Sequence, residues 1–186
     1  MARITEQHVK WAQQVQSKYG VPASVTLGQF IYESGAGTSN MAKQANNGFG
    51  VKGSGDAGSY ESRGSSWAKY SSMEQSFMAY GQLLQKDRYT QYTKTAKTSE
   101  EYLKGLVKGG YCSDSDYVSN VMSIIKSNDL EKYNTGASFS GSSTTENTSS
   151  NDAGFFEKIA INITKICICL VLVILAVLFI SQSFGG

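Results

Sequence analysis

The feature that most constrains the fold is an amphipathic segment that ends on a carboxylate and runs directly into glycines. Apolar or small side chains recur there at the i, i+3, i+4 and i+7 spacing of one buried helical face. They are Leu27, Phe30, Ile31 and Ser34. Gly35 and Gly37 follow, and glycine readily adopts the positive φ angles at which helices commonly end. The pattern predicts a helix over about residues 22–34.

Glu33 is the carboxylate in the last turn of this predicted helix. A carboxylate at that position faces the negative end of the helix dipole, and partial burial at the rim of a core adds a second penalty on its charged form. Both effects raise the pKa of the group, which suits an acid that must protonate a leaving atom near neutral pH. A solvated glutamate at a helix end is the alternative interpretation.

Periodicity and capping signals predict the other elements of a domain over residues 1–133. Helices are expected over residues 5–19 and 41–45, after Ser72, after Ser99, and from about Asp114, with Val118, Val121, Met122 and Ile125 buried in the last. Ser72 and Gln75 match a capping box of the Ser-x-x-Gln form. Residues 60–70 predict a β-hairpin that turns near Arg63 and Gly64.

Four motifs follow one another in a specific order along the chain. They are Glu33-Ser34-Gly35-x-Gly37-x-Ser39 with Ala42, then Asn46-Asn47-x-Phe49-Gly50-x-Lys52, then Tyr70-Ser71-Ser72-x-Glu74-x-Ser76-Phe77, then Gly109-Gly110-Tyr111-x-x-Asp114-x-x-Tyr117. Over about residues 5–133 this order resembles the glucosaminidase family of bacterial cell-wall hydrolases, glycoside hydrolase family 73. The resemblance implies a mainly α, lysozyme-like α+β domain with a small β-hairpin, which cuts the glycan strands of peptidoglycan.

The resemblance also implies roles for individual residues. Glu33 falls on the family's general acid. Tyr111 falls on its active-site tyrosine, whose ring would stack on a sugar while its hydroxyl supports the reacting N-acetyl group. The implied substrate-binding residues are Asn46, Asn47, Phe49, Gly50 and Tyr117.

The family's second catalytic acid comes from the hairpin, where Glu61 is the one acid in the corresponding stretch. The family's Thr-x-Glu-Tyr pattern is absent, because Ser59-Tyr60-Glu61 replaces it in a hairpin that looks shorter than usual. The alternatives are that Glu61 is a solvated hairpin residue and that Tyr111 packs under the last helix.

Composition excludes several other classes of function. The formal net charge is only +2, which gives no signal for nucleic-acid binding. The single histidine, His8, is expected to be structural, so neither a histidine-based metal site nor a Ser-His triad is indicated. Two of the three cysteines lie in an apolar run, which does not suggest a disulfide framework or a zinc site. We therefore expect carboxylate chemistry with no metal or organic cofactor.

The composition changes abruptly after Tyr133. Residues 134–154 are almost all small or polar, which predicts a flexible linker. Residues 155–181 include an uninterrupted apolar run, which predicts a transmembrane helix held in a lipid bilayer, and residues 182–186 form a short tail. The polar first residues lack the apolar region of a secretory signal peptide.

The orientation in the membrane stays open, because two indications conflict. Lys158 and Lys165 flank the apolar run on its N-terminal side, which by the positive-inside rule places the domain in the cytoplasm, whereas the implied substrate lies outside. We expect a membrane-anchored enzyme that acts on the cell-wall side and hydrolyses the β-1,4 bond between N-acetylglucosamine and N-acetylmuramic acid. A lytic transglycosylase or muramidase on the same fold, and an inactive membrane-tethered wall-binding protein, are the alternatives.

Overall fold

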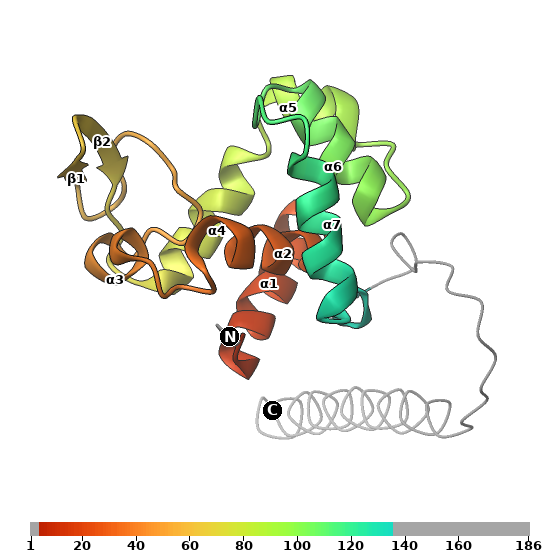
Figure 1. The fold of residues 1–186 in the computed structure, drawn as a ribbon, viewed down its shortest axis with the longest axis horizontal. Coiled ribbons are helices and arrows are strands. Elements are labelled where there is room, and N and C mark those ends of the chain that lie inside the picture. Colours follow the sequence, from red (N-terminus) through yellow and green to blue (C-terminus); the bar gives the residue numbers. More distant parts are fainter. Residues whose placement is uncertain (1–3, 136–186) are drawn as a thin grey trace, which may run out of the picture. The chain divides into compact units, whose positions relative to one another are not determined.

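A computed structural model describes residues 4–135 of the 186-residue chain. This part is mainly helical, with one small two-stranded antiparallel sheet, as predicted (Figure 1). Its elements in chain order are α1 (Glu6–Tyr19), α2 (Ala23–Ser34), α3 (Asn40–Ala45), β1 (Ser59–Ser62), β2 (Ser65–Ala68), α4 (Met73–Leu83), α5 (Asp87–Thr93), α6 (Ser99–Lys108), α7 (Tyr117–Ser127) and the 3₁₀ helix η1 (Leu130–Tyr133).

Helix α2 is the central element of the core (Figure 1). Nine of its twelve residues are buried, because its side chains are small or apolar on nearly every face. It packs against α1, α7 and η1. Gly28 permits the close approach of α7, since a Cβ atom at this position would lie 2.7 Å from Cγ1 of Ile125. Burying a side chain such as Phe30 stabilises the fold by roughly 1.5–3 kcal/mol, so α2 is firmly held.

The C-terminal end of α2 lies where the glycines predict it. Gly35 has a φ angle of +58°, and its N–H donates to the carbonyl oxygen of Ile31. The hydroxyl of Ser34 donates to the carbonyl of Phe30 and accepts from the N–H of Gly37, which fixes the turn after the helix. Glu33 therefore lies in the last turn of a buried helix, at a rigid chain reversal.

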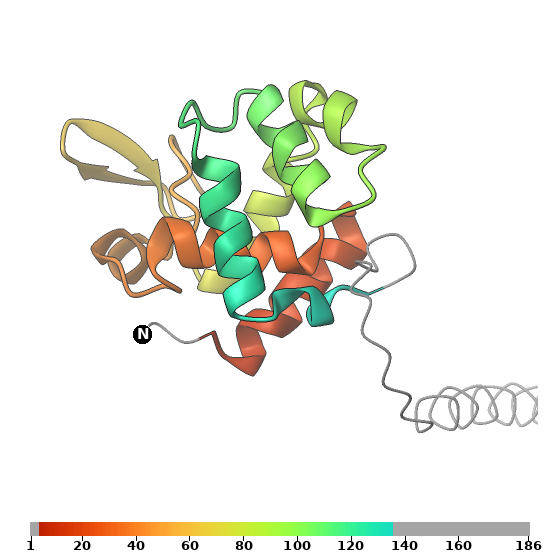
Figure 2. The same cartoon turned by 45° about the vertical axis from the view of Figure 1, so that its right-hand side comes forward.

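The predicted β-hairpin is present and turns at the predicted residues. Arg63 and Gly64 both have positive φ angles, +51° and +71°, as a two-residue turn of type I′ requires. Tyr60 lies opposite Trp67 in the ladder. The hairpin projects from one side of the helical body, beside α3 (Figure 2), and the Tyr60 hydroxyl donates to Gln44 of α3.

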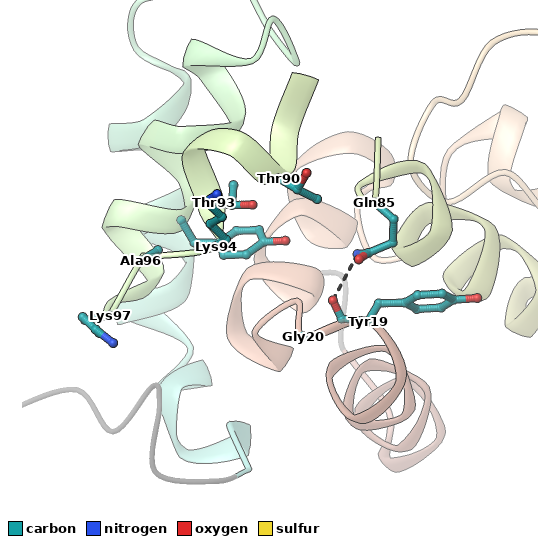
Figure 3. A pocket seen from close by; sticks show the side chains of 9 residues that line it. Tyr19, Gly20, Gln85, Thr90, Thr93, Lys94, Ala96 and Lys97 are labelled. Carbon is teal, nitrogen blue, oxygen red and sulfur yellow. Dashed lines mark hydrogen bonds between the residues drawn. The ribbon is translucent and has the colours of Figure 1, made fainter. Parts of the chain in front are cut away.

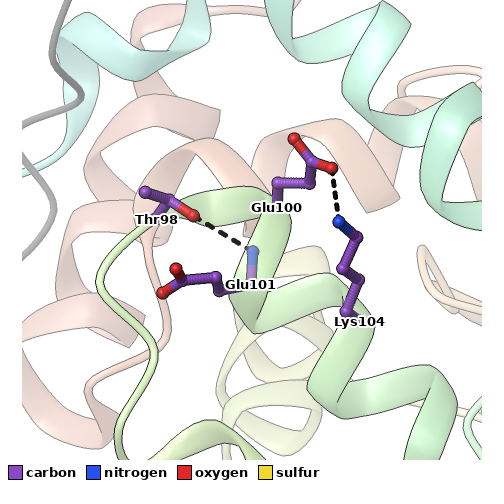
Figure 4. Close-up of polar contacts among 4 residues, drawn as sticks. All are labelled: Thr98, Glu100, Glu101 and Lys104. Carbon is purple, nitrogen blue, oxygen red and sulfur yellow. Dashed lines mark hydrogen bonds and ion pairs between the residues drawn. The ribbon is translucent and has the colours of Figure 1, made fainter.

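Helix α5 was not predicted, and it packs on α6 to form a small lobe. Gly105 of α6 permits this contact, because a Cβ atom there would lie 2.7 Å from the carbonyl oxygen of Tyr92. Helix α6 begins with a side-chain cap, in which the Thr98 hydroxyl accepts from the N–H of Glu101 (Figure 4).

Two details of the predicted helices differ from the structure. Helix α7 begins at Tyr117 rather than near Asp114, because the Asp114 carboxylate accepts from the N–H of Asp116 and holds a turn before the helix. Val118 and Met122 are only partly buried, whereas Val121 and Ile125 are fully buried as predicted. Elsewhere, the Ser72 hydroxyl accepts from the N–H of Gln75, which is one half of the predicted capping box.

Residues 134 and 135, which follow the predicted boundary at residue 133, are hydrogen-bonded to the helical domain. Gln16 of α1 exchanges two hydrogen bonds with the backbone of Thr135, and the side chain of Asn134 accepts from the N–H of Ser24. The rest of the predicted linker, the predicted transmembrane helix and the tail lie outside the described residues. Within residues 4–135, no helix combines the length and the apolar character needed to cross a bilayer.

Candidate active site

A cleft of about 430 Å³ lies at the C-terminal end of α2, where the loop after α3, the α4–α5 junction and the loop after α6 converge. Its lining residues are Glu33, Phe49, Gly50, Val51, Lys52, Leu83, Lys86, Arg88, Tyr89, Tyr111 and Cys112. Segments that are far apart in the sequence therefore meet at one place. Glu33 is the one carboxylate among these lining residues, so carboxylate chemistry in the cleft depends on it.

The side chain of Glu33 is accessible to solvent, but the surrounding protein partly desolvates its carboxyl group and so disfavours the charged form. Its Oε1 atom accepts a hydrogen bond from the Tyr117 hydroxyl at 2.8 Å. Burial raises the pKa of Glu33, and the hydrogen bond from Tyr117, which favours the charged form, offsets this effect only in part. The net pKa of Glu33 is raised, which is the direction that general acid catalysis requires. With Oε1 occupied by Tyr117, Oε2 is left to carry a transferable proton.

A buried chain of hydrogen bonds fixes the Tyr117 hydroxyl. This hydroxyl accepts from Nε2 of Gln29 at 2.7 Å, and Oε1 of Gln29 accepts from the Tyr80 hydroxyl. Gln29 and Tyr80 are fully buried, and Tyr117 is 1% exposed. Because the Gln29 amide donates to Tyr117, the proton of the Tyr117 hydroxyl is left free to point at Glu33. Gln29, Tyr80 and Tyr117 are therefore positioning residues for Glu33.

Tyr111 lines the cleft and is partly buried between two other tyrosines. Its ring centroid lies 6.1 Å from that of Tyr89 and 5.8 Å from that of Tyr117. Burial, followed by the nearby charge of Glu33, raises the pKa of Tyr111, so its hydroxyl stays protonated and can donate a hydrogen bond. The preceding Gly109 is needed for space, because a Cβ atom there would lie 2.4 Å from the carbonyl oxygen of Arg88.

The structure gives Asn46 and Asn47 partners within the protein. Asn46 is the C-cap of α3 with a φ angle of +50°, and its side chain donates to the carbonyl of Tyr70. Asn47 is 1% exposed and clamps the hairpin base by bonding the backbone of Val51 and Ala68. Neither asparagine is among the residues that line the cleft. Their predicted role in substrate binding stays a prediction.

Of the other three predicted substrate-binding residues, two line the cleft and one is buried behind Glu33. Phe49 and Gly50 line the cleft. Phe49 is 3% exposed and stacks on Tyr80 with ring centroids 4.1 Å apart, so it forms a rigid wall rather than a free surface. Tyr117 is buried and its hydroxyl is directed at Glu33, which is the contact of a positioning residue.

Glu61 lies outside the lining of the cleft. It is exposed on β1, opposite Ser66, and the alternation of the strand places it on the face away from Tyr60 and Trp67. The neighbouring acid Asp56 accepts from the backbone N–H and the hydroxyl of Ser71, and these bonds lower the pKa of Asp56. The assignment of Glu61 as the second catalytic acid stays a prediction.

Several residues of the cleft and its support were not singled out from the sequence. They are the wall residues Val51, Leu83, Tyr89 and Cys112, the cations Lys86 and Arg88, and the buried residues Gln29 and Tyr80. Lys52 belongs to one of the quoted motifs, but the sequence assigned it no role. A signal existed for Gln29, because it precedes Glu33 by one helical turn and is a polar side chain on a buried helix. No comparable signal marks Arg88, because it lies on the short helix that periodicity does not reveal.

Three other cavities within residues 4–135 offer no comparable acid. The cavity in Figure 3, about 300 Å³ between the end of α1 and the α5–α6 lobe, has no carboxylate in its lining. Two further cavities include Glu100 or Glu101. Glu100 is paired with Lys104 at 2.7 Å, which lowers the pKa of Glu100 (Figure 4). Glu101 accepts from the backbone N–H of Lys97. Within residues 4–135, no group of three or more metal-ligating side chains could hold a metal ion.

A helical, lysozyme-like domain with a small sheet and one acid of raised pKa in a cleft has the properties of a glycoside hydrolase. The chain belongs to the glucosaminidase family. The model of this family, described as mannosyl-glycoprotein endo-beta-N-acetylglucosaminidase, matches residues 9–130.

Individual relatives agree with this assignment. The chain is 31% identical over 140 residues to the exo-glucosaminidase LytG of Bacillus subtilis (strain 168), a match that covers 66% of this chain and 49% of that protein. The chain thus spans about half the length of this curated relative.

Solved structures share the fold. The catalytic domain of the autolysin Auto from Listeria monocytogenes aligns with a TM-score of 0.59 and 25% identity, over 72% of this chain and 91% of that domain. A peptidoglycan hydrolase from Sphingomonas sp. A1 aligns with a TM-score of 0.56 and 23% identity, over 76% of this chain and all of that one.

Proposed function

We propose that this protein hydrolyses the β-1,4 bond between N-acetylglucosamine and N-acetylmuramic acid in peptidoglycan, with Glu33 as the general acid. The observation that supports it most directly is the placement of Glu33 in the cleft, where burial raises its pKa and Tyr117 orients its carboxyl group. Membership of the glucosaminidase family supports the type of bond. The names of the relatives, which include an autolysin and a peptidoglycan hydrolase, support the polymer.

The proposed first step uses the two oxygens of Glu33 for different purposes. Oε1 accepts from Tyr117, and Oε2 gives its proton to the glycosidic oxygen as the bond from that oxygen to C1 of N-acetylglucosamine breaks. The group that attacks C1 must come from elsewhere, since Glu33 is the only carboxylate in the lining of the cleft. The carbonyl oxygen of the substrate's own N-acetyl group can form that bond, as in substrate-assisted glycosidases.

In the second step a water molecule attacks C1 and the acetamido group is restored. The Glu33 carboxylate, having lost its proton, accepts one from this water, so the acid returns to its starting state. Tyr111 keeps its proton because burial raises its pKa, and its hydroxyl is a donor in the cleft that could hold the N-acetyl group. Glu61 is the alternative second group. Its position outside the lining favours the acetamido route.

The test is the chemistry of the products that the full-length protein releases from purified peptidoglycan. Mass spectrometry after borohydride reduction should find reduced N-acetylglucosamine at the new ends. Reduced N-acetylmuramic acid would instead identify a muramidase, and a 1,6-anhydro product a lytic transglycosylase. Intact strands that remain bound to the protein would identify a wall-binding protein without activity.

We also propose that residues 155–181 anchor the protein in a membrane, with the enzyme domain on the cell-wall side. The proposal depends on the length and apolar character of this run, which reaches the roughly 20 residues that a bilayer-spanning helix needs. Fractionation with carbonate and high-salt washes tests it. Protein that washes off would refute the anchor, and protease protection of the domain in right-side-out vesicles would place it on the cytoplasmic side.

A further inference from the structure

The cleft around Glu33 carries three cationic side chains that acid catalysis does not use. Lys52 comes from the loop that leads to the hairpin, Lys86 from the α4–α5 junction, and Arg88 from α5. The cations therefore lie on two different walls of the cleft. Glu33 is the only acid among the residues that line the cleft, so the lining has an excess of positive charge.

None of these cations is neutralised within the described part of the chain. The ion pairs found in residues 4–135 join Glu100 to Lys104 (Figure 4) and Asp129 to Lys132, and neither lies in the cleft. Glu33 itself bonds to Tyr117, and no cation is among the groups that shift its pKa. The three charges are thus available to a ligand that enters the cleft.

Two of the three cations are held in place by aromatic rings. The Arg88 guanidinium lies 4.4 Å from the ring centroid of Tyr89 and donates to the hydroxyl of the same residue. Tyr89 is 2% exposed and therefore rigid. Nζ of Lys52 lies 5.5 Å from the ring centroid of Trp67. Because these long side chains are ordered before a ligand binds, binding costs less side-chain conformational entropy.

The backbone places Arg88 beside the segment that carries Tyr111. The close approach of Gly109 to the carbonyl oxygen of Arg88 joins the start of α5 to the Gly109–Gly110 loop. Arg88, Tyr111 and Glu33 also line the same cleft, so a group held by Arg88 lies in the cleft that the reacting sugar would enter. A planar guanidinium suits a carboxylate in particular, because its fork can form two parallel hydrogen bonds.

We propose that Arg88, with Lys86 and Lys52, forms a subsite for a carboxylate of the substrate next to the bond that is cut. This inference rests on the proposed function and adds to it a means by which the enzyme distinguishes carboxylated glycans from uncharged ones. N-acetylmuramic acid differs from N-acetylglucosamine by a lactyl ether, whose carboxyl group is either free or extended by a peptide with carboxylates of its own. An uncharged glycan offers no such group.

The test compares kcat/KM on three substrates that share one sugar backbone. The first is peptide-bearing glycan strands, the second is peptide-free strands with free lactyl carboxylates, and the third is the second after methyl esterification. The variants are Arg88→Gln, Lys86→Gln and Lys52→Gln. Lys94→Gln is the matched control, because Lys94 is an exposed lysine at the opposite end of α5 and lines a different cavity (Figure 3).

Arg88→Gln should lose about tenfold in kcat/KM on the carboxylated strands, about 1.4 kcal/mol, and less than about twofold on the esterified ones. Arg88→Lys, which keeps the charge but not the fork, should fall between the two. Lys94→Gln should match the wild type on all three. Loss on peptide-bearing strands alone identifies the peptide as the source of the carboxylate, and loss on peptide-free strands identifies the lactyl group.

Equal losses on esterified and carboxylated strands, or no loss on any, would overturn the subsite. A thermal melt of each variant excludes misfolding as the cause of a loss. Failure of the proposed function is a separate result, in which the wild type cuts none of the three substrates. The subsite is then tested by binding of the same strands to the full-length Glu33→Gln protein and its Arg88→Gln double variant, where the same tenfold difference is expected.

Discussion

Replacing Tyr117 by phenylalanine removes one oxygen atom at the centre of the buried network and keeps the ring. The Tyr117 hydroxyl accepts from Gln29 at 2.7 Å and donates to Glu33 at 2.8 Å. Its loss leaves a buried amide donor without that partner, which costs about 1–3 kcal/mol of unfolding free energy. For a domain of this size, the melting temperature should fall by roughly 3–10 °C.

The same change should move the pH dependence of catalysis in a defined direction. The hydrogen bond from Tyr117 favours the charged form of Glu33, so its loss raises the pKa of Glu33 further. The active form of a general acid is protonated, and activity is lost as pH rises through its pKa. The alkaline limb of kcat/KM should therefore move to higher pH in Tyr117→Phe, while kcat falls because the carboxyl group is less well oriented.

The assay is kcat/KM on peptidoglycan between about pH 4 and pH 9, combined with denaturant unfolding. Tyr60→Phe is the matched control, because it removes a tyrosine hydroxyl that bonds to Gln44 outside the cleft. Adding Gln29→Leu to Tyr117→Phe should cost less than the sum of the single changes, since the unpaired donor is removed as well. An alkaline limb that stays in place or moves to lower pH would refute the role of Tyr117.

Four further changes test other parts of the structure. Glu33→Gln should reduce turnover by at least roughly 10²–10⁴-fold. It should also raise the unfolding free energy at neutral pH. The folded state favours the protonated form of Glu33, so the charged carboxylate destabilises the fold as pH rises through the raised pKa, and the neutral glutamine removes that cost. The gain should vanish below the ordinary pKa of a glutamate, where Glu33 is neutral in both states. Glu61→Gln should lower turnover less than Glu33→Gln does, and unchanged kinetics would show that Glu61 is a surface residue. Gly28→Ala should destabilise the domain by about 1–3 kcal/mol in denaturant melts, because its Cβ atom meets Ile125. Deletion of residues 155–186 should release the protein from membranes with peptidoglycan hydrolysis intact; a protein that stays bound, or that folds without activity, contradicts the anchor or the independence of the domain.

Features with local signals were predictable from the sequence. The end of α2 follows from an amphipathic run stopped by Gly35, and the hairpin turn follows from Gly64 between two short strands. Both depend on interactions within a few residues of the chain. The position of Glu33 at the rim of the core belongs to the same group, since helical periodicity alone places it there.

Features that depend on distant contacts were not predictable. Helix α5 has seven residues and only two buried ones, Tyr89 and Thr93, which is too few to establish a period. The bond between Gln29 and Tyr117 joins residues 88 positions apart, and no pattern in one sequence reports such a pair. The excess of cations in the cleft likewise arises only when the α4–α5 junction folds against the loop that carries Lys52.

The contact between Gln16 and Thr135 has a mechanical consequence. One side chain makes two hydrogen bonds with one backbone unit, so the chain leaves the described domain at a fixed point, and the Asn134–Ser24 bond shares that load. Ser24 lies nine residues before Glu33, about 14 Å away along the axis of α2. A pull at Thr135 is therefore taken up by α1 and by the start of α2, away from the end of α2 that carries the acid.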